Sequence, residues 1–372
     1  MQVVICSDGI FPERIGGIQR HTRLLVETLA AEHPALDLVV VHPHVGRRVF
    51  ADSPAVREIT VAPRPGRKQY LLECHDLSKR IAEVLRTLPD AVIYSQGYAV
   101  WSGAKEFAPR LIVNFHGLES FQALTLKDWL IGMPFRAVTR RIARDARFVV
   151  SLGGRLTTIL RTIVSQPDRR LVVLPNGVNV PADPAPDRQR RPGGLSILFV
   201  GRFAANKGIG DLLEAYRIVT ADGDQSGTEL HLVGDGPLYA DLKASHERPD
   251  VHFHGKASDE VLDGLYRSVD LFVLPTLFEG MPTVVLEAMA RGLPIAVTDV
   301  GATRELVDDT NGFIIPKRDP GSLAATLRAF ARLSAEQRRS LGAASLCKVR
   351  ERFTWSAVAA AHVRLFERVA AG

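Results

Sequence analysis

The chain has 372 residues, of which 46% are hydrophobic and 24% are charged, as in average soluble globular proteins. This composition excludes a largely disordered chain, a collagen-like fibre and a disulfide-rich miniprotein. No apolar run reaches the roughly 18 residues of a membrane-spanning helix, and the first apolar segment lacks the basic flank of a signal peptide. Three widely spaced cysteines fit neither a disulfide framework nor a zinc site, and indicate a reducing cytoplasm.

The positive charge of the chain is concentrated in its first half. The net charge is +6, and residues 1–180 hold 24 Lys and Arg against 16 Asp and Glu, whereas residues 181–372 hold 23 against 25. Such an asymmetry predicts that the first half faces an anionic partner. Nucleic acid, an anionic membrane surface and a phosphorylated substrate all meet that description.

Short apolar segments alternate with segments of helical periodicity along the first half. Continuous apolar strands between helices indicate a parallel sheet covered on both faces. The predicted strands are residues 2–6, 36–41, 91–94, 110–115, 147–150 and 171–174, and the predicted helices are residues 17–31 and 70–88.

Residues 181–194 are rich in proline, glycine and charge, so they predict an interdomain linker. The alternation then restarts, which predicts an α/β protein with two doubly wound domains, 1–180 and 195–352, and a last segment, 353–372, that crosses back onto the first. Ligands of such sheets bind outside the carboxyl ends of the strands. The predicted strands here are 195–200, 229–233, 251–253, 271–274, 294–298 and 313–315, and the predicted helices are 209–220, 259–268, 283–290, 320–333 and 355–371.

Two glycine-containing turns follow predicted strands and precede predicted helices. Gly16-Gly17 lets the backbone approach a ligand, and the helix start offers N–H groups to an anion. In the segment 201–208, Arg202 presents a planar fork of donors and Lys207 a mobile point charge, which together suit a diphosphate. The alternatives are a purely structural turn and two solvated cations.

The segment 279–287 places two carboxylates on either side of a predicted helix start. Glu279 and Glu287 can accept hydrogen bonds from hydroxyls of a sugar and a ribose, while backbone amides between them meet phosphates at the positive helix end. The alternative is one capping carboxylate and one solvated helix residue. The residues between the loop carboxylate and the helix are Gly280, Met281, Pro282 and Thr283.

Three further positions follow predicted strands and so face the expected cleft. Gly234 begins a Gly-Asp-Gly-Pro turn, His116 precedes a glycine, and His254 does the same. Gly234 and His254 are expected at the edge of the site. His116 has an equally good structural interpretation, and for His254 the structural interpretation is the stronger one. No His-x-Glu, Cys-x-x-Cys or Asp-x-Asp grouping indicates a metal site, so we expect none.

These motifs, in this order and with these gaps, resemble the retaining glycosyltransferases of family 4, which have the two-domain GT-B fold. The resemblance covers nearly the whole chain. Its motifs are Gly16-Gly17, His116-Gly117, Pro175-Asn-Gly-Val178, Gly201-Arg-Phe with Lys207-Gly208, Gly234-Asp-Gly-Pro237, residues 279–290 and Phe353-Thr-Trp355.

The resemblance implies a role for each matched residue. Arg202 and Lys207 would bind the donor diphosphate, Glu279 the transferred sugar, and Glu287 the ribose. The loop 280–283 would meet sugar and phosphates. Gly16 and Gly17 would approach the diphosphate, and His116 would sit beside the reacting centre. Met281-Pro282-Thr283 departs from the commoner Phe-Gly-Leu and leaves the sugar open.

The resemblance further implies a UDP- or GDP-sugar co-substrate, no other cofactor and no metal. The acceptor would be a glycan or lipid-linked molecule in cell-surface polysaccharide, lipopolysaccharide or glycolipid synthesis. We expect a cytoplasmic enzyme, peripheral on the inner face of the plasma membrane, because the first half is basic. That surface would include Arg136, Arg140, Arg141, Arg144 and Arg147, with Arg47, Arg48, Arg64, Arg67 and Lys68.

Two alternatives from other classes are kept. A nucleotide-sugar epimerase or a phosphorylase could use the same fold, and the products separate these from a transferase. A nucleic-acid-binding module would explain the basic half. The low aromatic content of 7% and the lack of a recognition helix do not favour it.

Overall fold

The computed structural model describes residues 1–62, 70–123, 125–183, 194–221 and 227–372. The chain forms two compact units: Met1–Gly177 together with Trp355–Gly372, and Val178–Thr354. Most of the predicted linker, at 184–193, lies outside the described residues. The predicted α/β class with two doubly wound sheets is confirmed.

The first unit is built on a seven-stranded sheet in the order β3-β2-β1-β4-β5-β6-β7, in which all pairings are parallel. The order reverses between β1 and β4, so the carboxyl ends of these strands form a switch point. The strands are β1 (Gln2–Cys6), β2 (Asp37–His42), β3 (Arg57–Thr60), β4 (Val92–Gln96), β5 (Leu111–Asn114), β6 (Phe148–Ser151) and β7 (Leu171–Val173).

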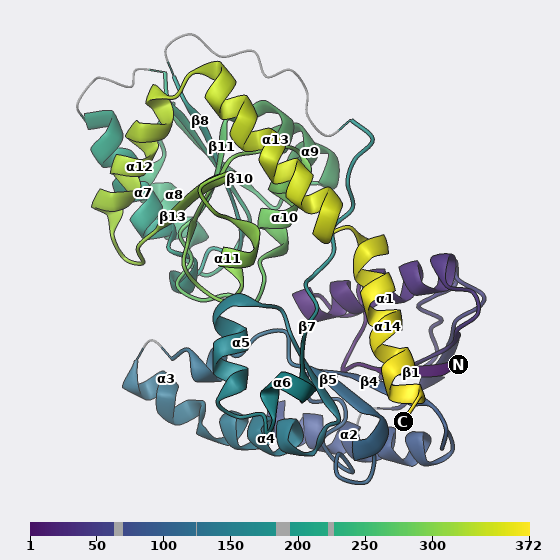
Figure 1. The fold of residues 1–372 in the computed structure, drawn as a ribbon. Coiled ribbons are helices and arrows are strands. Elements are labelled where there is room, and N and C mark those ends of the chain that lie inside the picture. The colour runs from purple at the N-terminus through teal and green to yellow at the C-terminus, as the bar shows by residue number, and fades with distance from the viewer. Residues whose placement is uncertain (63–69, 124, 184–193, 222–226) are drawn as a thin grey trace. The chain divides into compact units, whose positions relative to one another are not determined.

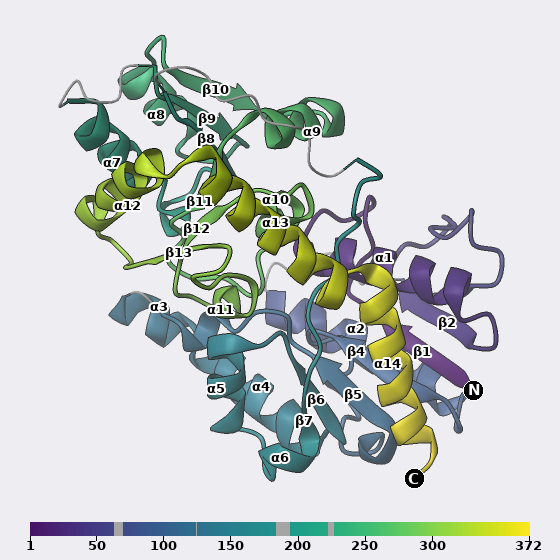
Figure 2. The same cartoon turned by 45° about the horizontal axis from the view of Figure 1, so that its top comes forward.

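One face of this sheet packs against α1 (Gly17–Glu32) and α14 (Trp355–Ala370), which run beside each other (Figure 1). Figure 2 shows α4 and α5 on the other side of the sheet. Burial of alternate strand residues against the two helix layers explains why the strands read as continuous apolar runs. The other helices are α2 (Tyr70–Arg86), α3 (Leu126–Ile131), α4 (Met133–Asp145), α5 (Gly154–Arg161) and α6 (Pro167–Arg170), with 3-10 turns at Ala108–Arg110 and Glu119–Phe121.

The second unit repeats the plan with six strands in the order β10-β9-β8-β11-β12-β13, again all parallel. Its switch point lies between β8 and β11. The strands are β8 (Ser196–Val200), β9 (Glu229–Val233), β10 (Val251–Gly255), β11 (Leu271–Leu274), β12 (Ile295–Thr298) and β13 (Gly312–Ile315).

Helices connect the strands of the second unit, and further helices follow its last strand (Figure 1). Among the described residues, every helix of the chain is too short or too polar to cross a lipid bilayer. The helices are α7 (Ile209–Ala221), α8 (Tyr239–His246), α9 (Asp259–Ser268), α10 (Thr283–Ala290), α11 (Thr303–Leu306), α12 (Pro320–Arg332) and α13 (Ala335–Arg352), with a 3-10 turn at Ala205–Lys207.

The apolar elements agree with the predicted ones to within two residues, but polar and short elements were not predicted. The clearest is α13, whose long charged sequence carries no apolar stripe. Its start has a recognisable signal, because Ser334 and Gln337 form a reciprocal capping box.

Candidate functional site

The loop after β8 holds the two predicted phosphate-binding cations. Arg202 is exposed, whereas Lys207 ends a 3-10 turn and is half-buried. Gly208 has φ +67°, and a Cβ there would lie 2.0 Å from the carbonyl oxygen of Pro275. Glycine therefore lets this loop lie directly against the chain that leaves β11.

Lys207 Nζ donates to Glu279 Oε1, so two motifs that are 72 residues apart in sequence form an ion pair. The side chains are 21% and 16% exposed, respectively, which keeps the pair reachable from solvent. The backbone supports it, because the amide of Leu277 donates to the carbonyl of Asn206 over 2.8 Å. A charged, partly buried pair at the carboxyl end of two central strands is a place where an anionic ligand can displace the carboxylate.

The loop of Glu279 is held from behind by the turn after β12. Gly301 has φ +51°, and a Cβ there would lie 2.3 Å from the carbonyl oxygens of both Glu279 and Gly280. The amide of Ala302 donates to the Gly280 carbonyl over 2.8 Å. Sequence reasoning did not single out Gly301, although a glycine after a buried strand was the available signal.

The helix α10 begins at Thr283 after Pro282, as the sequence predicts. Glu287 lies one turn inside it and is half-buried. Tyr266 Oη donates to Glu287 Oε2 over 3.1 Å, and the Arg291 guanidinium lies 4.9 Å from the Tyr266 ring centroid. Glu287 is therefore held against α9 and is not a freely solvated helix residue.

Gly234 packs on the same loop, since a Cβ there would lie 1.9 Å from the carbonyl oxygen of Gly201. Its φ of +132° is one that L side chains rarely adopt. The Gly234 amide donates to the carbonyl of Gly255 over 2.8 Å, while the His254 side chain turns to His231. The structure thus gathers the turns after β8, β9 and β11 at one edge of the second sheet.

In the first unit, Gly16 precedes α1 and Gly17 begins it. A Cβ at Gly17 would meet no described atom within 4 Å, whereas one at Gly16 would meet the flexible Gln19 side chain. The first turn of α1 carries no acidic residue, so its positive end is compatible with an anion.

His116 has φ +60°, and its amide donates to Asn114 Oδ1 over 2.9 Å. Its Nε2 contacts Gln96 Oε1, and its ring lies edge-on to His21 with centroids 4.7 Å apart. Burial, and then the nearby His362, lower the pKa of His116 to about 3. The imidazole is therefore neutral near pH 7, and Nε2–H donates to Gln96.

A buried polar chain links His116 to the last helix of the same unit. Asn114 Nδ2 donates to Tyr94 Oη over 3.1 Å, and Tyr94 Oη lies 3.0 Å from His362 Nε2. His362 Nδ1 donates to the carbonyl of Val358 over 2.8 Å, so its Nε2 accepts from the tyrosine. The backbone of His116 is thus positioned by residues of β4, β5 and α14.

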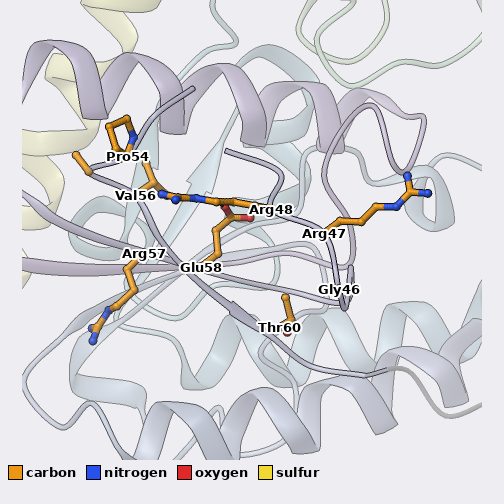
Figure 3. A pocket seen from close by; sticks show the side chains of 9 residues that line it. Gly46, Arg47, Arg48, Pro54, Val56, Arg57, Glu58 and Thr60 are labelled. Atoms are coloured by element: carbon orange, nitrogen blue, oxygen red, sulfur yellow. The ribbon is translucent and has the colours of Figure 1, made fainter. Parts of the chain in front are cut away.

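A pocket of about 550 Å³ opens between β3 and the loop that follows β2 (Figure 3). Arg47, Arg48 and Arg57 line it together with Glu58. Glu58 accepts from the amide of Val49 over 2.7 Å and lies 3.5 Å from Arg48, so one of the predicted surface cations is already paired. The predicted Arg64, Arg67 and Lys68 lie outside the described residues.

The arginines of α4 do not all face solvent, which corrects the predicted basic surface. Arg136 is buried and donates to the carbonyls of Ser120 and Trp129 over 2.7 Å each. Arg147 is half-buried, and its Nη1 donates to the carbonyl of Pro109 over 3.2 Å. The exposed cations of α3 and α4 are Lys127, Arg140, Arg141 and Arg144.

The sequence analysis missed an exposed apolar group on and next to α3. Large side chains there are about half exposed or more, although such residues normally turn inward. A six-residue helix that is apolar on several sides was the available signal. The residues and their exposed fractions are Leu126 (76%), Trp129 (49%), Leu130 (53%), Ile131 (57%) and Met133 (49%).

Both units match protein-family models. A model described as "Glycosyltransferase Family 4" matches residues 15–181, and one described as "Glycosyl transferases group 1" matches residues 194–332. The phosphatidyl-myo-inositol mannosyltransferase of Mycobacterium leprae is 32% identical over 205 residues. That match covers 54% of each chain, so the chain spans about half the length of this relative.

Solved structures resemble the chain over nearly its full length. A sucrose-phosphate synthase from Thermosynechococcus elongatus has a TM-score of 0.80 at 20% identity, covering 100% of this chain and 99% of its own. An Anabaena protein solved in complex with UDP has a TM-score of 0.73 at 16% identity, covering 99% of this chain and 100% of its own. At these identities the likeness shows the fold alone.

Proposed function

We propose that this chain, which belongs to the family 4 glycosyltransferases, transfers a sugar from a nucleoside-diphosphate donor to a glycan or lipid-linked acceptor with retention of configuration. The observation that carries the proposal is the Lys207–Glu279 ion pair, with the exposed Arg202 on the same loop as Lys207. The Anabaena protein of the same fold has been solved with UDP and with UDP-glucose, which supports a nucleotide-sugar donor.

In the proposed mechanism a ligand exchanges the partners of the ion pair. The donor diphosphate draws Lys207 Nζ away from the Glu279 carboxylate, and Arg202 contacts the same phosphates as a planar fork. Glu279 is then able to accept hydrogen bonds from hydroxyls of the transferred sugar. Without the donor, the ion pair therefore holds the Lys207 and Glu279 side chains in place, and their two charges sum to zero.

Glu287 would bind the ribose of the donor. A carboxylate accepts from two neighbouring hydroxyls at once, and the Tyr266 hydroxyl holds this one in a defined orientation. Gly16 and Gly17 at the start of α1, together with His116, would act from the first unit.

Breaking the bond between sugar and phosphate loads negative charge on the leaving diphosphate. Arg202, Lys207 and the amides at the start of α10 would stabilise that charge, so the proposed departure needs no metal ion. Removal of one such preorganised donor typically costs about 2.7–4 kcal/mol of barrier. The acceptor would attack the same face that the diphosphate leaves.

A thermal-shift series with UDP, GDP and their sugar esters tests the donor, since a ligand that binds only the folded state raises the Tm. Stabilisation by one nucleotide class, lost in Lys207→Ala, supports the proposal. NMR of the product formed with acceptor then reports the anomeric configuration. Phosphate-dependent release of sugar phosphate, or epimerisation without acceptor, would instead assign the alternative activities.

We further propose that the first unit docks on an anionic membrane surface, which would make the enzyme peripheral to the cytoplasmic side of the plasma membrane. The apolar residues of α3 are exposed, and Lys127 and Arg140 lie on the same segment of chain. Apolar side chains insert at the headgroup boundary while cations attract anionic lipids. Such a location suits a lipid-linked acceptor in cell-surface polysaccharide or glycolipid synthesis.

A further inference from the structure

The edge of the second sheet carries a cluster of imidazoles and one carboxylate. His231 of β9 pairs in register with His252 of β10. Glu229 lies two positions before His231 on β9, so the alternation of side chains places it on the same face. His254 lies at a register shift of β10, and its ring stacks on His231 with centroids 5.3 Å apart. Phe253 points to the opposite face, where it packs against Phe203.

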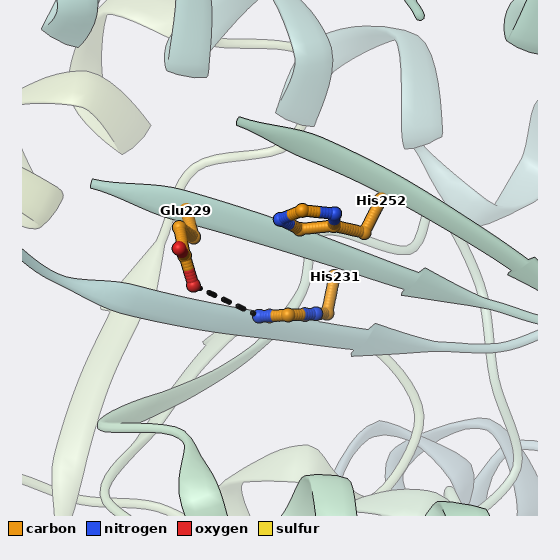
Figure 4. Close-up of side chains that lie close together, drawn as sticks. All are labelled: Glu229, His231 and His252. Carbon is orange, nitrogen blue, oxygen red and sulfur yellow. Dashed lines mark ion pairs between the residues drawn. The ribbon is translucent and has the colours of Figure 1, made fainter. Parts of the chain in front are cut away.

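The ligand atoms of Glu229, His231 and His252 all lie within 4.8 Å of one another. His231 Nε2 is 3.6 Å from Glu229 Oε2. The His252 ring lies over the His231 ring with centroids 4.7 Å apart and planes at 19°. Figure 4 shows that both rings turn an edge towards the Glu229 carboxylate.

We propose that Glu229, His231 and His252 bind a divalent d-block cation, with Zn²⁺ as the physiological ion. Two imidazole nitrogens and one carboxylate oxygen are ligands that zinc prefers, and water would complete a tetrahedral shell. Ligand atoms in such a shell lie about 3.3 Å apart, so each pair has to approach by no more than about 1.5 Å from the observed separations. A rotation of the stacked His252 ring supplies that movement.

His254 serves as a positioning residue for this site. Its Nε2 lies 3.1 Å from His231 Nδ1. When Nδ1–H of His231 donates to His254, the lone pair on His231 Nε2 points towards Glu229, which is the tautomer a metal requires.

A bound ion would link the edge strand β10 to β9 through side chains of both strands. The carbonyl of Gly255, one residue beyond His254, accepts from the Gly234 amide in the turn after β9. Fixing β10 would therefore hold this turn as well as the strand edge. The inference is independent of sugar transfer, because it concerns stability and metal content and not turnover.

The test uses the full chain without a histidine tag, in a Cys347→Ser background because this thiol is exposed. Metal-free protein is titrated with ZnCl₂ and CoCl₂. We expect one ion per chain by elemental analysis, a rise in Tm with zinc, and an intense visible Co²⁺ spectrum typical of four coordination. This Co²⁺ spectrum is recorded with Glu229, His231 and His252 all in place, so misfolding of a ligand variant cannot obscure the answer.

Variants assign the ligands. His252→Ala and His231→Ala abolish binding, while His254→Ala weakens it roughly 10–100-fold, as for other residues that orient a ligand. His246→Ala, which changes a histidine of α8 outside the cluster, leaves binding unchanged. Absence of saturable zinc binding, or binding that survives His252→Ala and His231→Ala unchanged, overturns the proposal.

Discussion

Tyr94 Oη and His362 Nε2 lie 3.0 Å apart, although 268 residues separate them in sequence. The hydrogen bond joins the central strand β4 to the last helix inside the first unit, and both side chains are fully buried. Because the tyrosine oxygen also accepts from Asn114, the pair ties the last helix to the strand that precedes His116.

We expect Tyr94→Phe to lower the unfolding free energy of the first unit by about 1–3 kcal/mol, because it leaves His362 Nε2 and Asn114 Nδ2 buried without this partner. All three tryptophans lie in that unit, so urea unfolding followed by tryptophan fluorescence reports on it. Tyr239→Phe is the matched control, since that hydroxyl makes only a 3.4 Å contact in the second unit. An unaltered Tyr94→Phe curve would contradict the expectation.

Stability of the first unit should fall as the pH drops below about 6.5, the ordinary value for histidine. Burial lowers the pKa of His362 to about 4, and burial also lowers the pKa of His21 well below its usual range. Between those values the unfolded chain binds more protons than the folded one. His362 alone therefore costs on the order of 3 kcal/mol once the pH falls through 4.

The measurement is the slope of unfolding free energy against pH, with and without His362→Phe. The variant should show a flatter slope between pH 6.5 and 4, whatever its absolute stability. Equal slopes in both proteins would mean that His362 keeps an ordinary pKa in the folded chain.

Lys207→Ala should lower kcat/KM by about 10²–10³ while the Tm changes little, since the pair is partly exposed and its proposed charge acts on the leaving diphosphate. The double variant Lys207→Ala/Glu279→Gln should lose less than the sum of the single losses, because the residues are in contact. Lys243→Ala serves as control, as it removes only a surface pair with Glu247 at 3.6 Å. Full activity in both Lys207→Ala and Arg202→Ala would refute the donor-binding role.

Gly208→Ala should destabilise the second unit by at least about 2 kcal/mol and weaken nucleotide binding, because it combines a left-handed φ with a collision at Pro275. Gly264→Ala is the opposite case: a helical glycine of α9 with no described atom near its Cβ position. That variant should gain up to about 1 kcal/mol. Thermal melts with and without nucleotide compare the Tm of the two variants. Equal Tm values would contradict the close packing of Gly208 against Pro275.

The full chain should float with anionic vesicles and not with neutral ones. Trp129→Ala combined with Leu130→Ala should reduce flotation strongly, and added salt should weaken it because the attraction is partly electrostatic. Val261→Ala, at a residue that is 50% exposed in the second unit, controls for general loss of surface apolarity. Flotation that is the same with neutral and anionic vesicles, and unchanged by the Trp129 and Leu130 substitutions, would contradict the membrane proposal.

Local patterns in the sequence predict the apolar strands and the turns that follow them, but not the more polar strand β3 (Arg57–Thr60). Runs such as Leu271–Leu274 are apolar because both faces of a parallel strand are covered, and that pattern is local. The start of α10 at Thr283 was equally readable, since proline at a helix start is a local signal.

Which of these residues come into contact depends on the order in which the strands pair. Lys207 reaches Glu279 because β8 and β11 are neighbours in the sheet, and His231 faces His252 because β9 and β10 pair in register. The helical spacing of the arginines predicts Arg136 on the surface, but in the fold its guanidinium is buried and donates to backbone carbonyls. Such contacts depend on strand order and on the space between elements, which no stretch of sequence encodes alone.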